Sequence, residues 1–143
     1  MRALIALAAL LPALAFGQAH QVREGSYTLR SSTVASTLID PRTAHAHGIE
    51  PASDRMVLNV LVQRDERGRH RNVSARVHAT ASNLAGMPRD IPMREARADN
   101  GDISYVGSFT HAPREVLDFA IRAEPQGTDQ ALSLHFRDRM PAH

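Results

Sequence analysis

The chain has 143 residues and contains no cysteine, no lysine and no tryptophan. Without cysteine it has no disulfides, no thiol chemistry and no lipid anchor attached through a cysteine. Without lysine it has no Schiff-base mechanism, and its 17 basic residues are all arginine. Aromatic residues make up only 4% of the chain, which leaves little surface on which sugars or nucleic-acid bases could stack. Packing alone must therefore hold the fold.

A strong charge of either sign is also missing. The formal net charge is +2 at pH 7, which is far from the strongly basic balance of a nucleic-acid-binding domain. We therefore expect no nucleic acid among the partners of this chain.

The one long apolar run spans residues 3–15 and follows a single basic residue. Small residues come next at Gly17 and Ala19. This order is typical of a secretory signal peptide cut after Ala19, and the run is shorter than the roughly 20 residues that cross a bilayer. We expect residues 1–19 to be removed and residues 20–143 to form one periplasmic domain without a transmembrane segment. Export excludes most nucleotide-dependent chemistry, and we expect no cofactor.

Short alternating segments separated by turn residues run through the rest of the chain. The predicted strands are 27–33, 56–63, 73–84, 91–98, 103–109, 116–123 and 132–136. Asp40-Pro41 predicts the start of a short helix and Gly48 its end, because these residues suit the cap, the first position and the terminus. The pattern favours an all-β fold, an immunoglobulin-like antiparallel β-sandwich of about seven strands with one short helix.

Three rows of apolar residues alternate with polar ones and are predicted to face the core. They are Val73, Ala75 and Val77; Leu117, Phe119 and Ile121; and Leu132, Leu134 and Phe136. Segment 56–63 is apolar on both faces, which predicts a central strand. Segment 91–98 is more polar and begins beside Pro92, which predicts a single edge strand.

The order and spacing of several short motifs resemble a known family of small exported bacterial proteins, the domain-of-unknown-function family DUF 4426. The resemblance runs from about Gly25 to Phe136. The motifs that carry it are Ser36-Thr37-Leu38 before the Asp40-Pro41 helix, Leu58-Asn59-Val60, Asn83-Leu84 with Gly86, Met93-Arg94-Glu95, Asn100-Gly101, then Ile103, Tyr105 and Phe109, and the segment 115–121. The resemblance implies an exported β-sandwich and no established activity.

Two departures from the family pattern concern aromatic residues. Family members carry an aromatic pair near the end, where this chain has His135-Phe136-Arg137, and a Tyr-Tyr pair where this chain has Ser104-Tyr105. If those aromatics form a binding surface, that surface is weaker in this chain.

Catalytic and metal-ligand patterns are not recognisable. There is no Gly-x-Ser-x-Gly nucleophile motif, so we predict that the chain is not an enzyme. His45 and His47 are two residues apart, and on a helix such side chains point about 200° from each other. No other histidine has the spacing of a metal ligand. We therefore predict that no metal is required.

One charged hairpin is predicted around Gly68. Its arginines, Arg64, Arg67, Arg69 and Arg71, surround Asp65 and Glu66. Such a cluster can bind anionic lipid headgroups or an acidic face of a partner protein. The other interpretation is a solvated turn that keeps the strands soluble. The sequence alone favours the solvated turn.

A second candidate group is Arg94, Glu95 and Tyr105 beside the Asn100-Gly101 hairpin. With a two-residue loop, Arg94 lies opposite Gly107 on the face of Tyr105. With a three-residue loop and a bulge, Glu95 opposes Tyr105, and Arg94 faces solvent opposite Val106. In either register a charged residue shares a face with aromatics, as in a salt bridge at a sheet edge or in a ligand site.

These observations together favour a periplasmic, non-enzymatic interaction or accessory module. Its expected partner is a protein or another component of the envelope, reached through the charged residues named above. The alternative is a periplasmic protein that binds a small ligand or a metal.

Overall fold

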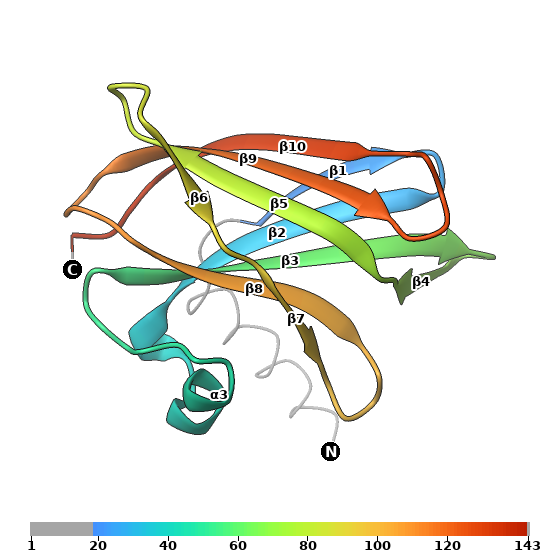
Figure 1. The fold of residues 1–143 in the computed structure, drawn as a ribbon, viewed down its shortest axis with the longest axis horizontal. Helices are drawn as coiled ribbons and strands as arrows, with labels where there is room; N and C mark the ends of the chain where they lie inside the picture. The colour runs from blue at the N-terminus through green and yellow to red at the C-terminus, as the bar shows by residue number, and fades with distance from the viewer. Residues whose placement is uncertain (1–18, 143) are drawn as a thin grey trace, which may run out of the picture.

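The computed structural model describes residues 19–142, which form two antiparallel sheets packed face to face (Figure 1). The predicted all-β sandwich with one short α-helix is confirmed, with ten strands in place of about seven. Within the described residues, no helix is long and apolar enough to cross a membrane.

The first sheet has six strands in the order β1-β2-β3-β8-β7, with β4 added on β3. Their bounds are β1 His20–Glu24, β2 Tyr27–Ala35, β3 Arg55–Glu66, β4 Arg69–Asn72, β7 Arg94–Arg97 and β8 Ile103–Thr110. Strand β3 is central, as predicted. Its first half pairs with β8 and its last residues pair with β4.

The second sheet has four strands in the order β10-β9-β5-β6. Their bounds are β5 Ala75–Ser82, β6 Pro88–Ile91, β9 Val116–Pro125 and β10 Leu132–Arg139. Strand β1 of the first sheet lies beside β10 of the second, so the first and last strands of the described chain meet at one side of the sandwich (Figure 1).

The prediction of one strand over 91–98 is wrong. The segment is divided at Pro92-Met93 into β6 and β7, which belong to different sheets. Pro92 has no N–H with which to continue a ladder, so the chain crosses from one sheet to the other there. Strands β1 and β4 were not predicted, because they are short and mostly polar.

Two short helices follow β2: the 3-10 helix η1, Ser36–Leu38, and the α-helix α3, Pro41–Ala46. Asp40 caps α3 as predicted, and its carboxylate accepts a hydrogen bond from the Thr43 N–H at 3.2 Å. Buried apolar residues form a small cluster between this segment and the outer face of the first sheet, comprising Val34, Ala44, Ile49 and Val57. This cover explains why β3 is apolar on both faces.

The main core lies between the two sheets, and the three predicted rows contribute to it. Leu117, Phe119 and Ile121 are almost completely buried. Two aromatic contacts extend from the central ring: Phe109 meets Phe119 edge-on at 5.4 Å, and Phe136 stacks on Phe119 at 4.8 Å. The row Val73, Ala75 and Val77, whose first member precedes β5, packs against the core but is only partly buried along its whole length. On β10, Leu132 and Leu134 are buried and Phe136 is partly buried.

The Asn100-Gly101 hairpin has the three-residue loop of the second alternative. Glu95 pairs with Tyr105, and Arg94 pairs with Val106. Gly101 has φ +89°, a left-handed conformation that glycine adopts without strain. The register that placed Arg94 opposite Gly107 is excluded.

Candidate functional site

The predicted charged hairpin is a two-stranded extension of the first sheet, at the end of β3 that β8 does not reach (Figure 1). It turns at Arg67-Gly68, where both residues have positive φ (53° and 81°), as a type I′ hairpin requires. We call its four arginines the arginine ribbon: Arg64, Arg67, Arg69 and Arg71. All four side chains are exposed.

The two acidic residues of the hairpin do not neutralise most of the arginines of the ribbon. Arg64 pairs with Glu66 at 3.7 Å, and its guanidinium lies 6.0 Å from the centre of the Tyr27 ring. The other carboxylate of the hairpin, Asp65, is bound by Arg23 of β1 at 3.0 Å. The remaining three arginines of the ribbon make no ion pair with any residue in the part of the chain that the structure describes. The structure therefore presents three free guanidinium groups on one narrow edge.

The second predicted group, Arg94, Glu95 and Tyr105, is not one site. Arg94 and Glu95 are neighbours on a strand, so their side chains point to opposite faces of the first sheet. Glu95 shares the inner face with Tyr105, whose Oη donates to Glu95 Oε1 at 3.3 Å. Arg94 lies on the outer face beside Gly48, next to a hollow of about 150 Å³. The structure brings together two of the three residues.

The hydroxyl of Tyr105 is buried and is held by hydrogen bonds. Its phenol oxygen accepts a hydrogen bond from the backbone N–H of Ala75 at 2.8 Å. Burial raises the pKa of Tyr105 above its usual value of 10.0, and the bond from Ala75 partly opposes that shift. Glu95 is further engaged by Arg97 at 3.4 Å. A buried phenol that holds its proton this firmly is a poor general base, so we assign it a structural role.

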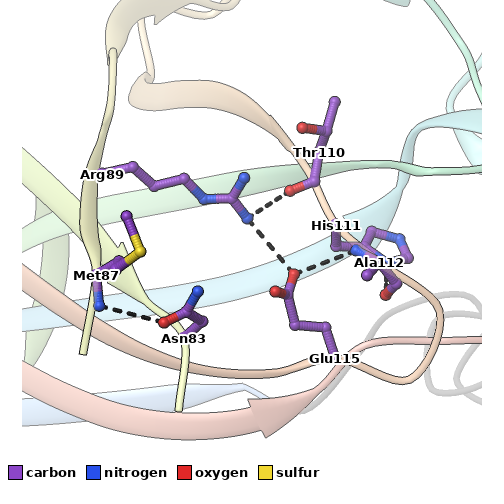
Figure 2. A network of polar contacts seen from close by, with 7 residues as sticks. All are labelled: Asn83, Met87, Arg89, Thr110, His111, Ala112 and Glu115. Atoms are coloured by element: carbon purple, nitrogen blue, oxygen red, sulfur yellow. Dashed lines mark hydrogen bonds and ion pairs between the residues drawn. The ribbon is translucent and has the colours of Figure 1, made fainter. Parts of the chain in front are cut away.

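Another polar network ties the two sheets together near the end of β8 (Figure 2). Arg89 of β6 donates to the Thr110 carbonyl at 2.5 Å and pairs with Glu115 at 3.7 Å. The same carboxylate accepts from the Ala112 N–H at 3.2 Å. His111 is buried, and its Nδ1 donates to the Ala112 carbonyl at 2.8 Å. These contacts hold backbone turns, so this network too is structural.

A pair not foreseen from the sequence joins the first strand to the last. The imidazole Nε2 of His20 lies 3.2 Å from both carboxylate oxygens of Asp138. The His20 ring stacks on Phe136, with 4.1 Å between ring centroids and 12° between planes. Both partners of this contact are largely enclosed, with side chains 20% and 13% exposed. Such a pair fixes the position and the hydrogen bonding of the imidazole.

Known proteins resemble this chain in sequence and in fold. The family model described as "Domain of unknown function (DUF4426)" matches residues 21–141. The chain belongs to the DUF4426 family. A search of curated proteins found no match.

Two solved structures share the fold of this DUF4426 domain. The crystal structure of a DUF4426 family protein (PA0388) from Pseudomonas aeruginosa PAO1 matches with a TM-score of 0.75 and 25% identity, over 87% of this chain and 96% of that chain. A copper-bound variant of FetP from uropathogenic Escherichia coli strain F11 matches with a TM-score of 0.60 and 10% identity, over 89% of this chain and 95% of that chain. The second likeness shows the fold alone.

Among residues 19–142 of this DUF4426 domain, no group of three or more histidine, cysteine, aspartate or glutamate side chains is placed to hold a metal ion. His45 lies in α3 and His47 caps the end of that helix.

In the sequence of this DUF4426 domain, His20 and Asp138 are each marked by one feature. His20 is the first residue after the predicted cut, and Asp138 continues the inward alternation of Leu134 and Phe136. Neither feature shows that β1 lies beside β10, because contacts between distant strands are not encoded locally. The pair could be identified only in the folded chain.

Proposed function

We propose that this protein is an exported, non-enzymatic interaction module that binds an anionic component of the cell envelope through the arginine ribbon. The observation that carries the proposal is the set of three unpaired, exposed guanidinium groups on the β3–β4 hairpin. Export is supported by the signal-peptide pattern of residues 1–19.

The chemistry of arginine suits this role. A guanidinium group is always charged and donates two parallel hydrogen bonds to a carboxylate or a phosphate. Among the described strands, β4 pairs only with β3, so a partner can reach the hairpin from its free side. Arginines on a rigid two-stranded ribbon lose less freedom on binding than arginines on a loose loop.

A non-enzymatic role is supported by what the polar residues do. The buried tyrosine, the Arg89–Glu115 pair and the buried histidine near it all hold backbone groups or neighbouring strands. The one hydroxyl among them that meets a carboxylate is Tyr105, which donates to Glu95 at 3.3 Å. Burial raises the pKa of this phenol, which makes it a poor nucleophile.

Metal binding is a second candidate function, and the His20–Asp138 pair is the observation that favours it. FetP, which shares the fold, is copper-bound in its solved structure. At 10% identity no ligand can be carried from FetP to this chain. A metal site here must be argued from the residues of this chain.

The test of the ribbon is retention of the mature protein on an envelope fraction from its host at low salt. Replacement of all four ribbon arginines by serine should abolish most of the retention, and added salt should weaken it in the unchanged protein. The matched control removes the same charge elsewhere on the surface, by serine replacement of Arg30, Arg42, Arg76 and Arg122. The control should be retained like the parent.

Two further measurements make the outcome decisive. Vesicles with and without anionic phospholipid separate a lipid from a protein as the envelope component. If the ribbon variant is folded and is retained as well as the parent at low salt, the hairpin is only a solubilising turn and the proposal fails.

A further inference from the structure

We propose that the mature protein binds one Cu(II) ion at its N-terminus, through the α-amine and the imidazole Nδ1 of His20, with Asp138 holding the ring from the other side. This inference rests on one part of the proposed function, cleavage after Ala19. It does not depend on the arginine ribbon.

Cleavage creates the first ligand. In the uncut chain the nitrogen of His20 is a peptide N–H, which is a poor metal ligand. After the cut it becomes a free amine, and an amine and the Nδ1 of the same N-terminal histidine can close a small chelate ring on one metal ion. Ala19 is exposed, so the new terminus faces solvent, where a metal ion can reach it.

Asp138 prepares the second ligand. All hydrogen bonds of the His20 ring within residues 19–142 use Nε2, which lies 3.2 Å from both Asp138 oxygens. A carboxylate at this position keeps the ring proton on Nε2 and leaves the lone pair on Nδ1 free. Metal-binding histidines in proteins typically donate their other ring nitrogen to a carboxylate in this way.

Phe136 and Ser31 complete the surroundings. Stacking on Phe136 fixes the plane of the His20 ring, so little rotational freedom is lost when a metal binds. Ser31 is the residue paired with His20 across β1 and β2, and its side chain therefore lies on the same face of the sheet. Its Oγ is buried without a hydrogen-bond partner among the described residues.

Cu(II) is the common divalent metal that these two nitrogen donors are expected to bind most tightly. Affinity of nitrogen and oxygen ligands rises along the first transition row to a maximum at Cu(II), and tetragonal sites of such ligands are typical of Cu(II) and Ni(II). The site differs from a cluster of three or more histidine, cysteine, aspartate or glutamate side chains, of which residues 19–142 hold none, because one of its ligands is the chain terminus.

The test uses mature protein purified from the periplasm, with its N-terminal residue determined by mass spectrometry. Titration with Cu(II) in a weak competing buffer, followed by visible absorbance and electron paramagnetic resonance, should show one site per chain. The chain has no lysine, so an amine-specific acetylating reagent modifies the α-amine alone. Acetylation should weaken Cu(II) binding by at least about 100-fold, the loss expected when one half of a chelate is removed.

Variants separate the roles of the two side chains. His20→Gln should lose the site. Asp138→Asn should bind Cu(II) about 10–100-fold more weakly, as is usual when the carboxylate behind a ligating histidine is removed. His135→Gln, an exposed histidine on the same strand as Asp138, is the control and should bind like the parent. Circular dichroism verifies that each variant is folded.

Several results would overturn the proposal. They are an N-terminal residue other than His20, unchanged Cu(II) affinity after acetylation, and unchanged affinity in His20→Gln. The first also contradicts the predicted cleavage site. The other two reject the copper site and leave export and the arginine ribbon untouched, because the ribbon variant should bind Cu(II) like the parent.

Discussion

The phenol oxygen of Tyr105, in the first sheet, accepts a hydrogen bond from the backbone N–H of Ala75, in the second sheet, at 2.8 Å. This bond satisfies a backbone donor at the start of β5 and connects the two layers directly. Tyr105 therefore stabilises the core through this hydrogen bond as well as through the apolar surface that its ring buries.

Removal of that hydroxyl should destabilise the protein. Tyr105→Phe keeps the ring and leaves the Ala75 N–H without its partner, and an unsatisfied buried donor typically costs about 1–3 kcal/mol. Tyr27→Phe, at the only other tyrosine of the chain, is the matched control. Chemical denaturation measures both. Equal unfolding free energies for Tyr105→Phe and the parent would show that water replaces the bond at no cost.

The same hydroxyl predicts a loss of stability at alkaline pH. Burial raises the pKa of Tyr105 in the folded protein above 10.0, so the folded state holds the phenol proton more tightly than the unfolded state. Its contribution is complete below the unfolded pKa and is lost as the pH rises through the raised folded pKa. Unfolding free energies measured at about pH 9 and about pH 11 should fall more steeply for the parent than for Tyr105→Phe. Identical slopes would contradict the assignment.

Gly107 should not tolerate even a methyl group. A Cβ there would stand 2.5 Å from the Pro92 carbonyl oxygen and 2.7 Å from the Met93 sulfur. Because one of these neighbours is backbone, Gly107→Ala should cost about 1–3 kcal/mol, the usual range for an overpacked core. Ser108→Ala on the same strand is the control. A thermal melt in which Gly107→Ala matches the parent would mean that the β6–β7 crossover moves freely.

Phe119 should be the most costly phenylalanine to truncate. It is 1% exposed and contacts both Phe109 and Phe136. Phe119→Ala should lower the unfolding free energy by about 3–5 kcal/mol, which in a domain of this size can unfold the protein. Phe136→Ala should cost less, because Phe136 is only partly buried. The reverse order, measured by denaturant titration, would contradict the observed packing.

Local patterns predicted most of the second sheet and the centre of the first. Alternation identified the inward rows of β5, β9 and β10, and continuous apolarity identified β3 as central. Asp40 and Pro41 marked the helix start correctly, since capping depends on neighbouring residues only. These features share one property: each is decided within about ten residues of chain.

Relationships between distant segments were not predictable in the same way. Pro92 indicated an edge, but nothing local showed that the chain changes sheets there. The loop at Asn100-Gly101 was open between two registers, because a bulge of one residue leaves no clear trace in the alternation. His20 and Asp138 lie 118 positions apart, and only the contact between β1 and β10 brings them together.

The arrangement of strand ends has a consequence for solubility. At one side of the sandwich β1 lies against β10, and at the other β6 runs directly into β7, so the outer strands of both sheets have a neighbour in the opposite layer. Among the described strands, β4 has β3 as its only neighbour in the sheet (Figure 1). Exposed edges of this kind invite pairing with a second chain, and arginines along them oppose it by charge repulsion. The arginine ribbon should therefore also oppose self-association, and a chain stripped of it should form oligomers as its concentration rises.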